Sequence, residues 1–510
     1  MVTASARSYE GMARDGRSRA RYVFRDGGGA DVITMKQPLR AEQRPHGPMA
    51  WRVTATDSFR DPWIAGRPLR VTVSGQALRD APELCAELLS LSKSDHLAID
   101  VSPYGHAKER PGVALLSYDH SEGSNWIVRR SSAPDEQRWL SADPAMLEGI
   151  AASVSEREGS PFEQARQLAV DLSAHRELEN DFFVVTSAYA LDHRADENVG
   201  LFSPAGLVSP REARRLIGTF LRARDDFRVG DNCIVDATLF YGALARGLLP
   251  TTVAAYRHCL AAARREKLER AAGHLEGIVV RVDHLAQSAD HLTVLAQHEA
   301  RYSAGNSVLD RQLYHLQNSV VLVTGALDML CWFVAALEGC TPDRFLIDRG
   351  QLFGPKKEPK WLQQLSDPTA MAIREAARNL GTDPRLEAAG ELRDSCQHRH
   401  PLRGGVADFL NALGLPTVTA SVVDVTATLD GSRVPQGIMG VLERGDLQLV
   451  LPEQFQRALL AALVDTVEAT LSCVRWDATD WWSSPGDAFH LDAGRLERFA
   501  VETFDLEHGM

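Results

Sequence analysis

The feature that most constrains the fold is a change in hydrophobic pattern at Ser209-Pro210. A serine at the N-cap followed by proline at the first helical position is a strong signal for the start of a helix. From there to about residue 410, nearly every window repeats its apolar residues with a helical period. The pattern predicts helices at 210–225, 233–247, 251–270, 274–300, 308–338, 358–365, 368–380 and 384–398. Helices joined by short connections predict a bundle.

The region that precedes Ser209, residues 20–208, carries mixed signals. Short β-like runs are separated by Gly, Pro, Asp and Ser, and three stretches have helical periodicity. The β-like runs are Tyr22–Phe24, Asp31–Met35, Trp51–Thr56, Leu69–Ser74, Leu97–Val101, Gly112–Tyr118, Trp126–Arg129 and Phe182–Ser187; the helix-like stretches are Ala81–Ser92, Pro144–Val154 and Pro161–Ala174. We expect an α+β domain of unknown type here, after a disordered basic tail at 1–19.

The helical period is lost again between residues 417 and 452. Four valines lie among Thr, Ser and Ala, and Asp430-Gly431 is a hairpin turn signal. We therefore expect a small β-hairpin insert at 417–452, a helix from Pro452 to about Val474, and an acidic tail at 476–510. The expected fold class is α+β, in which a mixed α/β region is followed by a mainly helical bundle at 209–475.

Composition limits the class of protein. The 510 residues include 44% hydrophobic residues, enough for a large core, and the net charge is −12. A global basic footprint for nucleic acid is thus absent, so phosphate contacts must come from a local patch. Seven cysteines without a C-x-x-C pair indicate reduced thiols and a cytoplasmic protein. The apolar run Ser319–Leu337 is interrupted by Asp328, which favours a buried core helix over a membrane span.

The stretch from Thr382 to Gly405 has the most chemical content. Asp383-Pro384 begins a helix, and on that helix Arg393 shares one stripe with Leu386, Ala389 and Cys396. That stripe is otherwise apolar, and burial of a lone guanidinium is costly, so Arg393 must be paired or functional. Asp394 and His398 are i, i+4 neighbours, so the carboxylate can orient the imidazole.

The pattern Arg393-Asp394-x-x-x-His398 resembles the signature of HEPN domains, which is an arginine, a polar residue, and a histidine four to six residues further on. HEPN domains are helical bundles, and a long apolar helix such as Val320–Leu337 packs beneath their motif helix. The resemblance covers about residues 209–475, with the hairpin as an addition, and leaves the N-terminal region unassigned.

Catalytic HEPN proteins are metal-independent ribonucleases, so the resemblance implies an RNA substrate, no metal, no cofactor and no membrane. It implies that Arg393 stabilises charge on the phosphate, that His398 is the general acid or base, and that Asp394 orients the pair. The family's dimeric site implies a homodimer, since residues 393 and 398 lie about 140° apart on an ideal helix. Family habit further implies a defence or toxin role in a bacterium.

A basic loop is the second candidate site. Three of the seven lysines, Lys356, Lys357 and Lys360, fall within five residues and precede Trp361. Clustered lysines beside an aromatic ring suit contact with a nucleic-acid backbone. His400 and Arg403, just beyond the motif helix, complete the expected binding set. A solvated loop is the alternative for the lysines.

Two further features weigh on the assignment. His284, His291 and His298 are each seven residues apart, about 10.5 Å of rise, so they cannot chelate one ion and predict a polar helix stripe. We expect Asp328 to have a structural role in which it is buried and hydrogen-bonded. Its partner is Arg393 if the HEPN resemblance holds, and a Ser, Thr or Tyr elsewhere in the bundle otherwise.

Two alternatives to the nuclease stay open. The charge-balanced segment 383–403 is compatible with a non-catalytic dimeric helical module that binds a protein or a nucleic acid. It is also compatible with a purely structural Arg–Asp–His cluster at a helix end.

Overall fold

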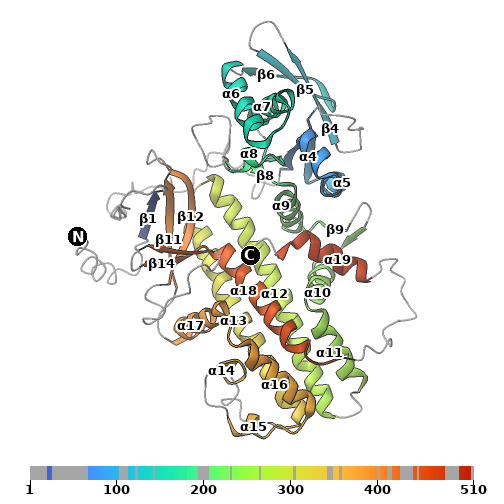
Figure 1. Cartoon of the computed structure of the whole chain (residues 1–510), viewed down its shortest axis with the longest axis vertical. Coiled ribbons are helices and arrows are strands. Elements are labelled where there is room, and N and C mark those ends of the chain that lie inside the picture. The colour runs from blue at the N-terminus through green and yellow to red at the C-terminus, as the bar shows by residue number, and fades with distance from the viewer. Residues whose placement is uncertain are drawn as a thin grey trace, which may run out of the picture.

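A computed structural model of the chain forms the basis for the fold (Figure 1). It describes residues 20–25, 67–102, 113–120, 125–141, 144–177, 180–192, 206–229, 233–262, 266–302, 306–341, 349–354, 359–398, 402–410, 416–425, 440–444, 447–476 and 493–506. The expected tail at 1–19 lies outside these residues. The structure is mixed α/β, with a sheet-containing N-terminal unit followed by a helical C-terminal region, as the sequence predicts at that level.

The N-terminal unit is built on a seven-stranded sheet. Its strands are β2 (Leu69–Val73), β3 (Leu97–Val101), β4 (Val113–His120), β5 (Asn125–Arg130), β6 (Ala133–Ser141), β7 (Phe182–Val184) and β8 (Leu207–Val208). The spatial order is β6-β5-β4-β3-β2-β7-β8. Strands β4, β3, β2, β7 and β8 are parallel, and β5 and β6 extend the sheet as antiparallel strands.

Helices cover both faces of this sheet. One face packs against α4 (Gly75–Asp80), α5 (Pro82–Ser90) and α9 (Pro210–Arg222). The other packs against α6 (Pro144–Glu158), α7 (Phe162–Glu177) and α8 (Ala188–Asp192). Strand β7 serves both cores, because Phe182 belongs to the first and Phe183 to the second. The unit of unknown type is therefore a three-layer doubly wound fold.

Helix α9 joins this unit to the helical region. It begins at Pro210 after a complete capping box, in which Ser209 and Glu212 satisfy each other's backbone N–H groups. The capping box explains why Ser209-Pro210 is a strong start signal. Helix α9 packs on α5 and also on α12 (Glu266–Tyr302) and α19 (Ala493–Phe504).

The helical region is centred on the long pair α12 and α13 (Asn306–Glu338), which cross the molecule side by side (Figure 1). Around them pack α10 (Ala237–Leu248), α11 (Pro250–Ala261), α16 (Pro368–Leu380), α17 (Pro384–His398) and α18 (Pro452–Leu471), while α14 (Arg349–Leu352) and α15 (Lys360–Gln363) are short. A β9–β10 hairpin (Phe227–Val229 and Cys233–Val235) precedes α10. Each predicted helix has a counterpart, but residues 266–270 belong to α12 and not to the helix before it, and the predicted helical start at 233–235 is strand β10.

Helix α13 is a core helix. Among the described residues it is the one helix long and apolar enough to span a membrane, and 67% of its most apolar window is buried against protein. This agrees with the sequence preference for a buried helix and with a soluble protein.

The C-terminal sheet is larger than the expected hairpin. It has five strands in the order β1-β11-β12-β14-β13, namely β1 (Ala20–Arg25), β11 (Arg403–Leu410), β12 (Pro416–Asp424), β13 (Val441–Arg444) and β14 (Leu447–Val450). Two expectations are wrong here. Strand β1 pairs in parallel with β11, so it belongs to this sheet and not to the N-terminal unit. Strand structure also begins at 403, where the sequence predicts only a helix stop.

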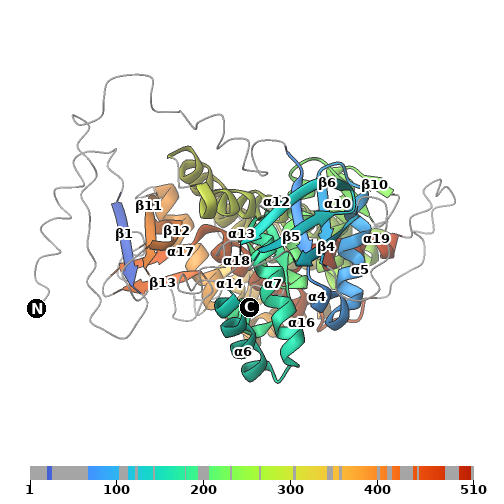
Figure 2. The same ribbon diagram turned by 90° about the horizontal axis from the view of Figure 1, so that it is seen from above.

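Close packing explains why strand β11 carries glycine. A Cβ atom on Gly404 would lie 2.7 Å from the side chain of Leu309 on α13, so a larger residue there would force Leu309 to move. The region after 476 also differs from the expected acidic tail, because residues 493–504 form α19, which packs on α10. Figure 2 shows the C-terminal sheet on the opposite side of the molecule from β4–β6.

Candidate functional site

Helix α17 carries the predicted motif and has the predicted bounds, Pro384–His398. Asp383 starts it, because its side chain accepts a hydrogen bond from the Arg385 backbone N–H at 2.8 Å and pairs with the Arg385 guanidinium at 2.8 Å. Leu386, Ala389 and Leu392 are buried against the bundle. The local sequence thus places the helix and leaves Arg393 at its edge.

Arg393 lies where α17 meets α13. Its Nη1 donates to Oδ2 of Asp328 at 3.5 Å, and 32% of the Arg393 side chain and 24% of the Asp328 side chain are exposed. A contact of 3.5 Å is at the limit of a hydrogen bond. The Nε atom of Arg393 is buried and has no hydrogen-bond partner among the described residues. The pairing of Arg393 with Asp328 is as expected, but Asp328 is half-buried and not fully buried.

The other two motif residues lie near the end of α17. Asp394 is exposed, and His398 is the last helical residue, but its side chain lies outside the described residues. The contact expected between these two therefore stays a prediction.

The expected binding residues are only partly described. Lys360 is exposed at the start of α15, while Lys356, Lys357 and His400 lie outside the described residues. Arg403 begins β11, but its side chain is outside the described part.

The ring beside the lysines has a different place from the one expected. The sequence suggests Trp361 as a stacking face for nucleic acid, but its ring packs against the core of the bundle. Because Trp361 is partly buried against the core, only part of its ring is available for stacking.

The histidine series follows one side of α12. His284 and His291 are exposed and His298 is half-buried, as a polar stripe predicts. His291 stacks on His315 of α13, with ring centroids 5.0 Å apart. Burial, then His291 and Arg311, lowers the pKa of His315 to about 4. No group of three possible metal ligands comes together within the described residues.

A polar cluster at the edge of the N-terminal sheet is not indicated by any sequence motif. The strand order reverses between β2 and β7, and in such sheets ligands bind beyond the carboxyl ends of the strands at the reversal. There the backbone N–H of Gly75 donates to Ser102 Oγ, which donates to Asp171, each at 2.9 Å. Gln167 donates to the other Asp171 oxygen at 2.9 Å.

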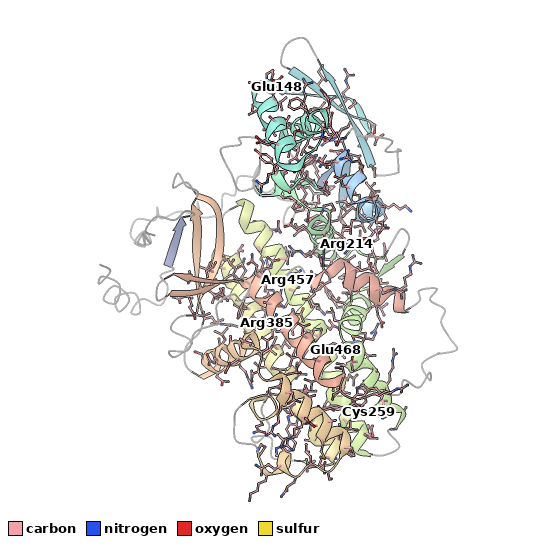
Figure 3. All side chains as sticks on the ribbon, viewed as in Figure 1. Glu148, Arg214, Cys259, Arg385, Arg457 and Glu468 are labelled. Atoms are coloured by element: carbon pink, nitrogen blue, oxygen red, sulfur yellow. The ribbon has the colours of Figure 1, made fainter. Side chains whose placement is uncertain are left out.

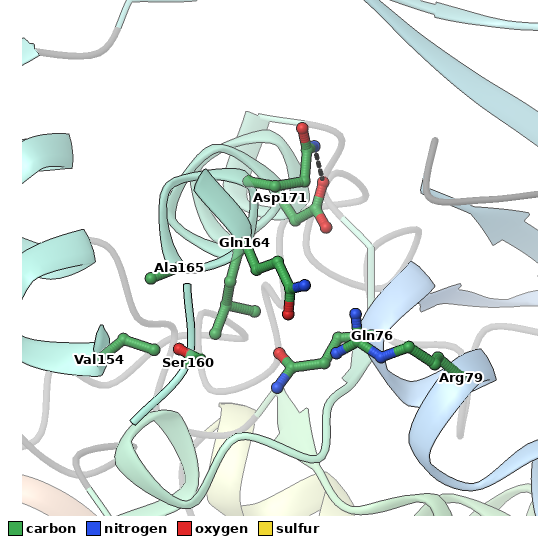
Figure 4. A pocket seen from close by; sticks show the side chains of 9 residues that line it. Gln76, Arg79, Val154, Ser160, Gln164, Ala165 and Asp171 are labelled. Atoms are coloured by element: carbon green, nitrogen blue, oxygen red, sulfur yellow. Dashed lines mark hydrogen bonds between the residues drawn. The ribbon is translucent and has the colours of Figure 1, made fainter. Parts of the chain in front are cut away.

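This cluster is closed in the structure. Asp171 is 2% exposed, and burial raises its pKa to about 6 because its partners are neutral. The adjoining cavity, between Gln76 and Arg79 of α4 and Gln164 of α7, has about 10 Å³, which is roughly what one water molecule needs (Figure 4). The cluster therefore holds α4, β3 and α7 together. Its one sequence signal is the predicted end of the β-like run Leu69–Ser74, directly before Gly75.

A second cluster that sequence reasoning misses lies at the centre of the molecule. Arg222 of α9 forms two hydrogen bonds with Asp290 of α12, at 2.5 and 2.8 Å. Tyr241 donates to the same carboxylate at 2.7 Å. In the sequence, Asp290 stands out only as the neighbour of His291. Its partners come from other helices, so no local signal points to them.

More charge surrounds this pair. The buried Arg457 of α18, labelled in Figure 3, lies 3.7 Å from Glu453, which also pairs with Arg215 of α9 at 3.1 Å. Burial, then Arg215, lowers the pKa of Arg457 to about 10. These ion pairs tie α9 to α12 and α18.

Comparison of the chain with family models, with curated proteins and with solved structures returns no significant match. The functional assignment therefore depends on the chemistry of the residues themselves.

Proposed function

We propose that the helical region is an HEPN-like, metal-independent endoribonuclease in which Arg393, Asp394 and His398 are the catalytic residues. The observation that carries the proposal is the loose pairing of Arg393, which is partly exposed and 3.5 Å from its carboxylate partner. An arginine with a purely structural role is normally held by short bonds, as Arg222 is by Asp290. Arg393 keeps donors that a phosphate can engage.

The proposed reaction is attack of a ribose 2′-hydroxyl on the adjacent phosphorus. His398 removes the proton from the 2′-oxygen, the 2′-oxygen bonds to phosphorus, and the bond to the 5′-oxygen breaks. The products are a 2′,3′-cyclic phosphate and a 5′-hydroxyl that takes up a proton. Arg393 stabilises the charge on the phosphate oxygens, for which its planar guanidinium is suited.

We propose that the active form is a homodimer. Tyr314, Val321 and Asp328 are seven residues apart on α13, so they lie on one side of that helix. Tyr314 and Val321 are exposed, as is Val280 on α12. A second copy of the chain that covers these residues would bring its own α17 near the first, so that Arg393 and His398 of different protomers could share a phosphate.

The remaining expected residues keep their proposed roles. Lys356, Lys357, Lys360, His400 and Arg403 would contact the RNA backbone, and the N-terminal unit would act as a sensor or substrate selector. We place such an enzyme in the cytoplasm of a bacterium, in stress or phage defence.

The test is cleavage of total RNA by the purified protein, with and without EDTA. We expect cleavage in both conditions. His398→Ala should lower the rate about 10²–10⁴-fold, because general acid–base help is lost. Arg393→Lys should not restore what Arg393→Ala removes, because the planar fork is absent.

Arg385→Ala is the matched control. Arg385 is on the same helix and is also paired with an aspartate, but it lies eight residues before Arg393, about 12 Å along the axis. Its loss should leave the rate unchanged. Cleavage that EDTA abolishes, or that survives substitution of both Arg393 and His398, would exclude the proposal.

A second candidate is a non-catalytic dimeric module that binds a protein or nucleic acid. The exposed apolar side chains on α12 and α13 favour it, because they need a partner but no chemistry. Sedimentation of the wild type and Val321→Asp tests the dimer. A dimer that binds RNA without cleaving it would support this second candidate.

A further inference from the structure

A hollow of about 330 Å³ lies between the start of α12 and the end of α13. It is lined by Arg270 and His274 of α12, and by Trp332 and Ala336 of α13, followed by Gly339. Its volume falls within the range of small-molecule sites in proteins. No expected site residue lines it.

The walls combine flat rings with positive charge. The rings of His274 and Trp332 are nearly parallel, with centroids 6.0 Å apart and planes at 26°. Burial lowers the pKa of His274, so this imidazole is neutral at pH 7. None of the lining residues in the described part of the chain carries a carboxylate, and Arg270 lies one turn before His274. The hollow therefore suits a planar, neutral ring that is attached to an anionic group.

Its position relates it to Arg393. Trp332 is four residues after Asp328 on α13, so the two lie on the same side, about 6 Å apart along the axis. Asp328 in turn contacts Arg393. The hollow and the proposed catalytic arginine are therefore connected through successive turns of α13, with Trp332 at the one and Asp328 at the other.

We propose that this hollow is a nucleobase pocket, in which one base of single-stranded RNA stacks on Trp332 while Arg270 contacts a phosphate. The assignment to RNA rests on the proposed function, because the pocket would hold a nucleotide beside the scissile one. Stacking on an aromatic ring tolerates any base, so the pocket sets strandedness and position more than sequence.

The test measures binding of a labelled single-stranded RNA to Arg393→Ala protein by fluorescence anisotropy. Addition of Trp332→Leu should weaken binding about 5- to 100-fold, the range for one stacked base. Trp332→Phe keeps a ring and should stay within about threefold of the parent on the same grounds. Circular dichroism of each variant separates lost binding from lost folding.

Arg270→Ala should weaken binding and reduce its salt dependence by about one counterion. Arg257→Ala, on α11 and away from the hollow, is the matched control and should do neither. In the active protein, Trp332→Leu should raise KM with kcat nearly unchanged.

The outcomes separate this proposal from the nuclease. If single-stranded RNA binding depends on Trp332 but the protein never cleaves RNA, the pocket is supported and the proposed nuclease function is contradicted. Cleavage that depends on Arg393 but is indifferent to Trp332→Leu and Arg270→Ala would overturn the pocket alone. Binding of AMP or UMP in this hollow without binding of RNA would overturn the RNA assignment.

Discussion

Asp171 in the N-terminal unit and Asp290 in the helical region are both almost completely buried, but the partners of the first are neutral and a partner of the second is charged. Asp171 is 2% exposed and Asp290 is 4% exposed. Asp171 accepts from neutral groups, Ser102 and Gln167, and burial raises its pKa to about 6. Burial would also raise the pKa of Asp290, but the Arg222 guanidinium lowers it below its usual value. Because both carboxylates are almost equally buried, the charge of their hydrogen-bond partners sets the direction in which each pKa shifts.

Titrating groups in the two regions therefore respond to acid in opposite directions. As the pH falls, Asp171 adds to the stability of the folded state and His315 subtracts from it. The pKa of Asp171 is higher in the folded state, so its contribution to stability is present at low pH and is lost as the pH rises from about 4 to 6. His315 in the helical region has its folded pKa lowered to about 4. Its contribution is lost as the pH falls from about 6.5 to 4. Asp290 adds a further loss only below about pH 4.

The largest effect should come from Asp290→Asn. The change leaves the buried Arg222 without its anionic partner, which should cost about 3–5 kcal/mol. Urea unfolding followed by circular dichroism would measure it. Asp283→Asn on the same helix is the control, since Asp283 bonds the side chain of Gln287 and is half-buried. An equal cost for both would show that Arg222 does not set the difference.

Asp171→Asn should raise the free energy of unfolding at pH 7, whereas Asp290→Asn should lower it. Because the pKa of Asp171 is about 6 in the folded state and lower in the unfolded state, its ionisation should lower the folding stability at pH 7 by roughly 3 kcal/mol relative to low pH. The neutral amide removes this cost, so the variant should lose the pH dependence of the N-terminal unit between about pH 4 and 6. Hydrogen exchange of peptides from β3 and α7 measures the stability of the N-terminal unit separately from that of the helical region. Unchanged pH dependence there would assign the effect to other groups.

A smaller effect is expected at the junction of the two regions. Ser209→Ala removes the side-chain cap of α9 and should cost about 1 kcal/mol. Because α9 packs on both regions, hydrogen exchange should rise in α5 and in α12. A rise confined to one of them would mean that α9 belongs to that region alone.

The smallest effect is expected for Asp328→Ala. The pair of Asp328 with Arg393 is long and partly exposed, so the loss of this pair should contribute about 1 kcal/mol or less. Thermal unfolding would measure this cost. A loss as large as that of Asp290→Asn would show that Arg393 is a structural arginine, which would weaken the nuclease proposal.

Local signals are enough to locate most helices. Ser209-Pro210 and Asp383-Pro384 combine a capping side chain with proline, and both begin a helix at the expected residue. Helix α17 also ends where the sequence indicates, so periodicity alone places Arg393 on a half-buried stripe. Each of these signals depends on neighbours within about one turn, which is the range over which capping and amphipathic periodicity act.

The sequence by itself determined the long helices, their apolar faces and the position of Arg393. Only the tertiary structure decided that β1 joins β11, nearly 400 residues away, and that Asp290 meets Arg222 from another helix. The order of the N-terminal strands and the hollow beside Trp332 were decided in the same way. The reason is physical: strand pairing, ion pairs and cavities depend on groups that the chain brings together only on folding, and such contacts leave no periodic trace in the sequence.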